Sequence, residues 1–180
     1  MHGIIFTSFR QFLTTRFDQA TATTSWRGEP TYSITASYPD AEFLRLFGKV
    51  CAHTGAEPDG LLRDFGVFTG ERTFVLLYPS FYEEAGDART FLLGVEERIH
   101  ELIRAVVPEA RPPRLRVEAH GEDGVSIRYD SPRRMCILLE GLLIGTARHY
   151  GETARVEEVR CMRRGDEACL FEARLAPNGA

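Results

Sequence analysis

The chain has no excess of basic residues, no long apolar run and few cysteines, and each of these absences excludes a class of protein. Its 22 Lys and Arg side chains are outnumbered by 26 Asp and Glu side chains, for a net charge of −4, so a nucleic-acid partner is not expected. No apolar stretch approaches the roughly 20 residues that cross a bilayer, so no membrane partner is expected either. Four cysteines among 180 residues do not form a disulfide framework, which favours a cytoplasmic protein.

The composition and length are those of one globular domain. With 43% apolar and 27% charged residues, the balance is ordinary. A chain of this length buries roughly 70% of its unfolded surface and can line an internal cavity. The first six residues, MHGIIF, have neither the basic segment nor the sustained apolar segment of a secretion signal. We therefore expect a single domain over residues 1–180 that is not exported.

Apolar residues at helical spacing predict helices in the first half of the chain. They occur over residues 3–17, over residues 40–54 and, more briefly, over residues 60–65. Residues 18–39 are rich in Thr, Ser, Gly and Pro and are predicted to be mainly loop. The longest predicted helix covers residues 87–107 and stops before Pro108.

The second half of the chain alternates in the manner of strands. Residues 114–130 predict one β-hairpin, and residues 153–161 with 168–175 predict another. A strongly apolar helix is predicted between them, over residues 133–150. This order predicts an α+β fold, with a mainly helical subdomain over residues 1–86 and a four-stranded antiparallel sheet with the long helix over residues 87–180.

One histidine, His100, lies in the long predicted helix. It is off the main apolar stripe and shares a second, narrow apolar line with Leu93 and Val107. The main stripe is formed by Leu92, Val95, Ile99, Leu102, Ile103 and Val106. Two interpretations are open. His100 is either a partly buried histidine bonded to a backbone carbonyl, or a neutral imidazole that serves as the axial ligand of a five-coordinate haem iron.

The segment Tyr129-x-Ser131-x-Arg133 ends a predicted strand and begins a predicted helix. Alternate residues of an extended segment share a face, so two hydroxyls and a guanidinium would converge beside a helix N-terminus, which favours an anion such as a pair of haem propionates. The alternative is a local role, with Ser131 as the N-cap and Pro132 as the first helical residue. The two roles are compatible.

Together these features resemble the haem-nitric oxide/oxygen-binding (H-NOX) domain over essentially the whole chain. The residues that carry the resemblance are Met1, Gly3, Ile4 and Ile5, then Tyr38-Pro39-Asp40 with Phe43-Leu44, His100, Pro112–Leu115, and the Tyr129-x-Ser131-x-Arg133 motif 29 residues after the histidine. The resemblance implies haem b as the cofactor, between the helical subdomain and the long helix. It implies His100 as the iron ligand, Tyr129, Ser131 and Arg133 as propionate-binding residues, Pro113 as the residue that presses on the macrocycle, and Ile5, Phe9, Phe74 and Leu142 as pocket residues.

The resemblance also implies which gases bind and how the signal leaves. Oxygen-binding members of the family carry a tyrosine nine residues after the motif tyrosine, where this chain has Leu138. Bound oxygen is held by a hydrogen-bond donor and nitric oxide needs none, so we expect nitric oxide and CO to bind without a stable oxygen complex. Nitric oxide would weaken the bond from iron to His100 and shift the two subdomains. With no room for an output domain in 180 residues, we expect a separate partner, such as a histidine kinase or a cyclic-dinucleotide enzyme.

Three cysteines, Cys136, Cys161 and Cys169, form a second candidate site. Cys161 and Cys169 flank a predicted hairpin and can be cross-strand neighbours. Several nitric-oxide-selective relatives bind zinc with three such cysteines and a histidine, and Glu158 stands here in the place of that histidine. Strand alternation favours Glu157 as the fourth ligand instead, and His149 is a further candidate. Zinc, a reversible disulfide and simple burial are the open interpretations.

Two alternative functions involve some of the same residues. The C-terminal segment around Cys161, Arg164-Gly165-Asp166 and Cys169 is also similar to a 4-vinyl-reductase-type domain that binds small molecules or tetrapyrroles, although that likeness leaves His100 unexplained. The other alternative is a cysteine or zinc redox switch. No nucleophile–base pair or phosphate loop is visible, so we expect a sensor and not an enzyme.

Overall fold

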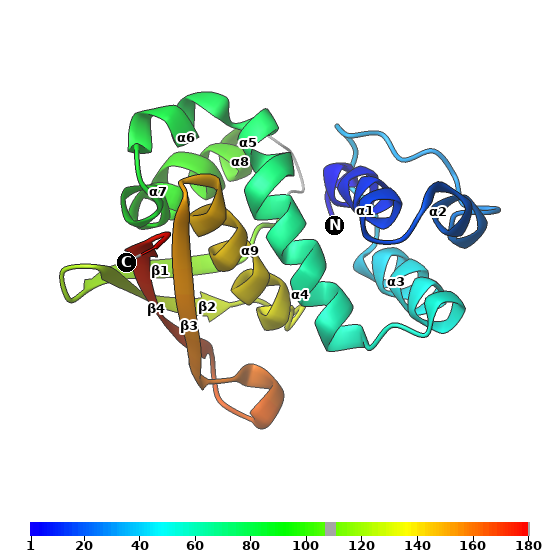
Figure 1. Ribbon diagram of the computed structural model, residues 1–180. Coiled ribbons are helices and arrows are strands. Elements are labelled where there is room, and N and C mark those ends of the chain that lie inside the picture. The colour runs from blue at the N-terminus through cyan, green and yellow to red at the C-terminus, as the bar shows by residue number, and fades with distance from the viewer. Residues whose placement is uncertain (107–110, 180) are drawn as a thin grey trace.

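The structure is a computed structural model that describes residues 1–106 and 111–179 (Figure 1). Its helices in the first half are α1 (Gly3–Arg16), α2 (Gln19–Ser25), α3 (Asp40–Thr54), α4 (Pro58–Phe68), the π-helical turn η1 (Thr69–Thr73), α5 (Phe74–Leu77) and α6 (Pro79–Ala85). Those of the second half are α7 (Ala88–Val95), the π-helical turn η2 (Glu96–His100), α8 (Glu101–Val106), α9 (Cys136–His149) and the 3₁₀ turn η3 (Met162–Arg164). The strands are β1 (Arg114–His120), β2 (Gly124–Asp130), β3 (Glu152–Arg160) and β4 (Cys169–Pro177).

The N-terminal helices pack around a cluster of aromatic side chains. Phe6, Phe9 and Phe12 of α1 are fully or almost fully buried and meet Phe43 of α3 and Phe65 of α4. Aromatic pairs of this kind add to the stabilisation that burial itself provides. Figure 1 shows α1, α2 and α3 on one side of the molecule, with α4 beside them.

Residues 18–39 are less irregular than predicted, because α2 occupies Gln19–Ser25. Asp18 accepts a hydrogen bond of 2.6 Å from the Thr21 N–H and so caps this helix. Thr and Ser are weak helix formers, and the helix is held by the burial of Ala22 and of the adjoining Trp26. The prediction of loop is wrong for these seven residues.

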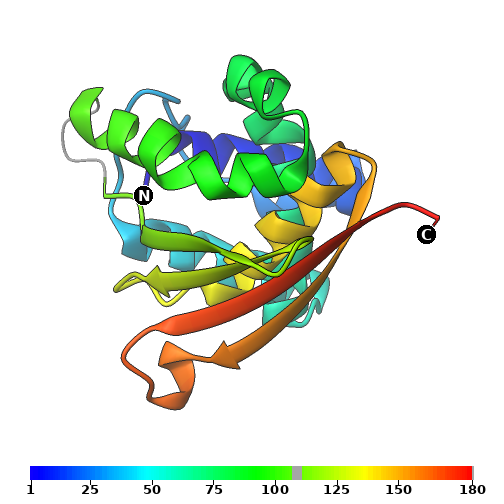
Figure 2. The same cartoon turned by 90° about the vertical axis from the view of Figure 1, so that its left-hand side faces the viewer.

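The sheet confirms the expected α+β fold. All pairs are antiparallel, in the order β1-β2-β4-β3, so each predicted hairpin forms and the two hairpins join through β2 and β4. Alternate residues of β2 and β4, including Ile127 and Phe171, are buried beneath the helices. Figure 2 shows the helical stretch of residues 88–106, which we call the proximal helix, running above the sheet.

The proximal helix differs from the prediction in its internal geometry. It begins at Ala88, and its middle turn, Glu96–His100, is π-helical. A π turn takes up more residues than an α turn, so the helical wheel is out of phase beyond it. Leu102, predicted on the buried stripe, is therefore 44% exposed, whereas the His100 side chain is largely buried. The predicted end of the helix at Val107 and Pro108 lies outside the described residues.

Helix α9 crosses α4 and η1 with their backbones in close contact. A Cβ atom added to Gly141 would lie 2.2 Å from the Arg63 carbonyl oxygen, and one added to Gly145 would lie 2.2 Å from the Val67 carbonyl oxygen. Gly66 of α4 is equally restricted, with 2.4 Å to the Leu138 carbonyl oxygen. Only glycine allows this approach. The crossing, seen between α4 and α9 in Figure 1, connects the N-terminal helices to the helix that lies on β3.

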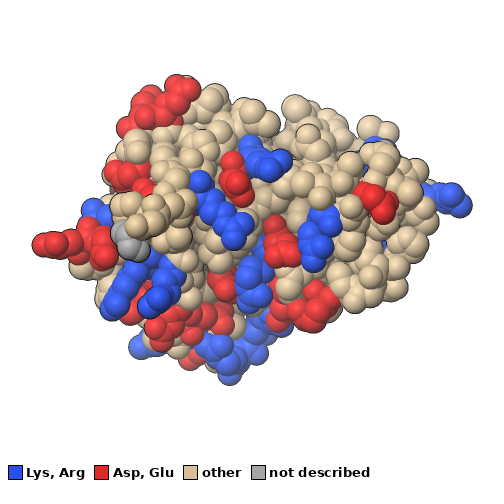
Figure 3. All heavy atoms as spheres, viewed as in Figure 1, with Lys and Arg blue, Asp and Glu red and all other residues tan. Residues whose placement is uncertain are grey.

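The surface carries both signs of charge. On the face drawn in Figure 3, basic and acidic side chains lie next to one another across the middle and lower part, whereas much of the upper part is uncharged. Among the described residues, no helix combines the length and the apolar character that a membrane crossing requires.

Candidate functional site

A cavity of about 280 Å³ lies between the proximal helix, strands β1 and β2, helix α9 and the start of α1. This volume is close to the lower end of the range for small-molecule pockets, about 300–1,000 Å³. The proximal helix contributes Leu92, Val95, Ile99, His100 and Ile103, and α9 contributes Leu138, Leu139, Leu142, Leu143 and Thr146. The cavity is therefore largely apolar between these two helices and has an imidazole in one wall.

His100 is held in the wall of the cavity with its side chain only 14% exposed. Burial lowers the pKa of this imidazole, and the neighbouring Glu96 carboxylate only partly opposes the shift. The Nδ1 atom lies 2.9 Å from Oε2 of Glu96. A carboxylate accepts hydrogen bonds, so Nδ1 carries the ring proton and Nε2 has the free lone pair that a metal would bind.

The motif residues Tyr129, Ser131 and Arg133 all line the cavity. The Tyr129 hydroxyl accepts a hydrogen bond of 3.2 Å from the Met135 N–H, and burial raises the pKa of this tyrosine. Arg133 is paired with Asp40, with 2.9 Å between Nε and a carboxylate oxygen, and its guanidinium also donates to the Arg111 carbonyl. A cation held at the cavity wall by one carboxylate can exchange that partner for the carboxylate of a ligand.

The local role predicted for Ser131 differs from the one observed. Helix α9 begins at Cys136, with Met135 at its N-cap and no side-chain cap. Ser131 instead accepts from the Arg133 N–H at 3.4 Å through its hydroxyl and from the Arg134 N–H at 3.1 Å through its carbonyl. This is a tight turn before the helix, in which Arg134 has a positive φ of 50°. Neither Ser131 nor Pro132 starts the helix, so that prediction is wrong.

The predicted pocket residues are brought together with one exception. Ile5, Phe74, Pro113, Leu138 and Leu142 all line the cavity. Phe9 does not, because it lies one turn beyond Ile5, where α3 and α4 cover α1. Its ring is fully buried, 5.1 Å from the ring of Phe65.

Glu96 is the site residue whose role sequence reasoning missed. Besides meeting His100, its carboxylate accepts from the Leu115 N–H at 3.1 Å and from the Arg104 guanidinium. Burial would raise its pKa, but these hydrogen bonds lower the pKa overall and keep the group ionised. The available signal was the spacing of four residues between Glu96 and His100, which places the two on one helix face.

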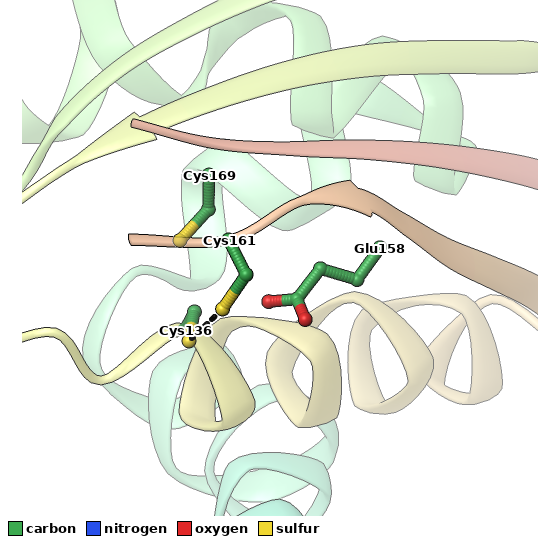
Figure 4. Close-up of side chains that lie close together, drawn as sticks. All are labelled: Cys136, Glu158, Cys161 and Cys169. Atoms are coloured by element: carbon green, nitrogen blue, oxygen red, sulfur yellow. Dashed lines mark hydrogen bonds between the residues drawn. The ribbon is translucent and has the colours of Figure 1, made fainter. Parts of the chain in front are cut away.

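The three cysteines and Glu158 form a separate cluster (Figure 4). Cys136 comes from the start of α9, Cys169 from the start of β4, and Cys161 directly follows β3. Ligand atoms of all four residues lie within 4.8 Å of one another, and the sulfurs of Cys136 and Cys161 are 3.7 Å apart. Burial raises the pKa of the Cys136 and Cys169 thiols, so they are protonated in the absence of a metal.

The fourth member of the cluster is Glu158 because β3 contains a bulge. Glu158 lies on the inner face of β3 with Ala154 and Val156, and the register against β4 shifts only after it, between Glu158 and Arg160, so Cys161 comes to lie on the face of Glu158. Glu157, which strict alternation favoured, is exposed, and His149 packs against Tyr82 and Tyr150 instead. Oε1 of Glu158 is buried without a hydrogen-bond partner in the described part of the chain.

Both sites have donors that suit the groups expected from the sequence. An apolar slot with a neutral imidazole in one wall and a guanidinium with two hydroxyls in another fits an iron porphyrin and its carboxylates. Two thiolates bound tetrahedrally to zinc at about 2.3 Å lie about 3.8 Å apart, which agrees with the 3.7 Å between Cys136 and Cys161.

Comparisons with known proteins agree with these observations. The sequence model of the family described as Haem-NO-binding matches residues 2–158. The fold is similar to that of an H-NOX protein from S. oneidensis in the Fe(II)NO state, with a TM-score of 0.87, 21% identity, and 98% of this chain and 99% of that chain covered. It is also similar to an Fe(II) unliganded mutant of an H-NOX protein from K. algicida, with a TM-score of 0.82, 25% identity, and 99% and 98% covered. None of the curated proteins compared matches the chain.

Proposed function

Because the chain belongs to the Haem-NO-binding family, we propose that it is a haem-based gas sensor over residues 1–180, with haem in the cavity and His100 as the iron ligand. The observation that carries this proposal is His100 itself. It is a neutral imidazole in the wall of an apolar cavity of about 280 Å³, with its Nδ1 proton already engaged by Glu96. A free Nε2 in such a place is what an axial ligand needs.

The remaining wall residues position the cofactor in this proposal. Arg133 would give up its pairing with Asp40 to bind a propionate, and Tyr129 and Ser131 would supply hydroxyl hydrogen bonds beside it. Ile5, Phe74 and Pro113 would bear on the macrocycle from the remaining walls. When bound, haem b supplies a five-coordinate ferrous iron with one open position for nitric oxide or CO.

Gas preference would depend on the wall formed by α9. Leu138, Leu139 and Leu142 present alkyl groups to the cavity. Alkyl groups cannot donate to bound oxygen, which is partly negative, whereas nitric oxide and CO do not need such a donor. We therefore assign the chain to the nitric-oxide-selective type.

The signal would leave the site along the proximal helix. His100 lies on this helix, and Glu96 ties the same turn to β1 through the Leu115 N–H. A change in the bond between iron and His100 would move the helix relative to the sheet, with the N-terminal helices coupled through the crossing of α4 and α9. A separate signalling protein, such as a histidine kinase or a cyclic-dinucleotide enzyme, would bind this chain and detect the change.

The optical spectrum of the reduced protein tests the proposal. We expect haem to copurify, or to be taken up from haemin, with spectral changes on addition of nitric oxide or CO and no stable oxygen complex in air. His100→Ala should abolish axial ligation by the protein, while the control His53→Ala, an exposed histidine of α3, should leave the spectrum unchanged. A folded protein that stays colourless in the presence of haemin would refute the proposal.

We further propose that Cys136, Cys161, Cys169 and Glu158 bind a structural zinc ion. The support is the unpartnered Oε1 of Glu158 among the described residues and the spacing of the sulfurs. Zinc would displace the thiol protons, and reduced thiols fit a cytoplasmic protein.

Metal analysis of protein purified without added zinc tests this second site. About one zinc per chain is expected in the wild type and in the control Cys51→Ser, whose thiol lies in α3. The Cys161→Ser variant should lose the metal. Metal-free wild-type protein, or a disulfide between Cys136 and Cys161, would instead favour a thiol switch.

A further inference from the structure

Glu96 is a partly buried acidic group whose position the proposed binding of haem does not require. Its side chain is 22% exposed, and its carboxylate contacts His100, Leu115 and Arg104. One carboxylate oxygen, Oε2, lies 2.9 Å from Nδ1 of His100 and 3.1 Å from the Leu115 nitrogen. The other, Oε1, is paired with the Arg104 guanidinium. Three groups from the helix and the sheet therefore meet at one carboxylate.

The π-helical turn makes this contact compatible with a ligand in the cavity. Glu96 and His100 are the first and last residues of η2. His100 remains among the residues that line the cavity while its Nδ1 is directed at Glu96. Insertions of this kind in helices are frequent at functional sites.

A carboxylate that accepts the second ring proton of a metal-binding histidine changes the ligand in two ways. It fixes the tautomer and the orientation of the ring, and it makes the metal-binding nitrogen a stronger electron donor. A cation on the same carboxylate has the opposite effect, because it draws charge away from the hydrogen bond.

We propose, on the premise that His100 ligates haem iron as above, that Glu96 is a positioning residue that strengthens His100 as a ligand, and that Arg104 moderates this effect. A firmer hold of His100 on the iron would oppose the release of this histidine on binding of nitric oxide. The pair Glu96 and Arg104 thus sets how readily the protein changes from the resting to the signalling state. The hydrogen bond from His100 to Glu96 also favours ferric over ferrous iron, because electron donation stabilises the higher charge.

A purely structural role for Glu96 makes different predictions. In that case the carboxylate only ties the proximal helix to Leu115 and Arg104, and its loss affects stability but not the iron. The two roles are separated by measurements on the iron and by two substitutions of opposite expected sign.

The experiment compares Glu96→Gln, Arg104→Gln and the control Glu97→Gln, a neighbour on the same turn. The iron–histidine stretching frequency of the reduced protein, measured by resonance Raman, should fall in Glu96→Gln, rise in Arg104→Gln and stay unchanged in Glu97→Gln. In Glu96→Gln the ferric–ferrous equilibrium should shift about tenfold toward ferrous, or about 59 mV for one electron. Electron paramagnetic resonance should show a smaller share of the nitric-oxide complex that keeps His100 attached.

The outcomes separate this inference from the function on which it depends. A wild-type protein that does not bind haem through His100 overturns both. A haem protein whose iron–histidine frequency is the same in all three variants overturns the role of Glu96 alone. If Glu96→Gln does not fold, Arg104→Gln still decides, because a frequency that falls or does not change contradicts the proposal.

Discussion

The contact between α9 and α4 can be tested by adding a single methyl group. In Gly141→Ala the new Cβ would lie 2.2 Å from the Arg63 carbonyl oxygen, and Gly66 Cα and the Val67 nitrogen are each 2.9 Å away. The usual separation of carbon and carbonyl oxygen in close packing is about 3.3–3.6 Å. The two helices would have to separate by about 1 Å, because all three neighbours are backbone atoms that cannot rotate away.

The magnitude follows from two opposing contributions. Overpacking costs about 1–3 kcal/mol, and contact with rigid backbone places this site at the upper end. Replacing glycine by alanine within a helix by itself raises the free energy of unfolding by about 1 kcal/mol. We expect the free energy of unfolding of Gly141→Ala to fall by about 2 kcal/mol, and its Tm by about 4–8 °C for a chain of this size.

Gly48→Ala is the matched control for this experiment. Gly48 lies within α3, and an added Cβ would meet nothing within 4 Å. The same chemical change should therefore raise the free energy of unfolding by up to about 1 kcal/mol. Urea unfolding followed by circular dichroism measures both variants. If Gly141→Ala proves as stable as Gly48→Ala, the reasoning about the crossing is wrong.

Three further predictions concern gas binding and two ion pairs. Leu138→Tyr should yield a stable oxygen complex in air, whereas Leu138→Phe, which has the ring without the hydroxyl, should not. Hydrogen bonding from Arg45 outweighs burial and lowers the pKa of Glu29 to about 2, so this carboxylate stabilises the protein fully above about pH 4.5 and loses the effect as the pH falls toward 2. Glu29→Gln should thus unfold about 1 kcal/mol more easily at pH 7, with a difference from the wild type that vanishes near pH 2 in urea titrations. Arg63 contacts Glu140 with 2.8 and 3.1 Å between nitrogen and oxygen atoms, and a double-mutant cycle should give a coupling of about 1 kcal/mol, whereas zero coupling would contradict a role in joining α4 to α9.

Elements with a strong local period were predictable from the sequence. The hairpin over residues 114–130 alternates strictly, and α1 repeats its apolar residues at helical spacing, so both formed where predicted. Helix α2 was not predictable in this way, because its Thr and Ser residues favour loops and only the burial of Ala22 and Trp26 stabilises it.

The residues of the candidate sites were predictable where the chain is regular and not where one residue is inserted. His100 and the Tyr129 motif could be identified from spacing, and the structure brings them to one cavity. The π turn displaced Leu102 to the surface, and the bulge in β3 exchanged Glu157 for Glu158. A single inserted residue moves every later residue of its helix or strand to a different face. A prediction that assumes a fixed period along the element cannot anticipate this shift.

Helix α9 combines two tasks on one face, because residues 138, 141, 142 and 145 recur at helical spacing. Gly141 and Gly145 hold it against α4 through main-chain atoms, while Leu138 and Leu142 face the cavity. Because main-chain atoms of Leu138 and Leu142 also meet Gly66 and Gly70, the residues that form the cavity wall belong to the crossing as well. A shift of α9 at the crossing would therefore also displace the leucines that border the ligand, so that detection and mechanical linkage are coupled within one helix.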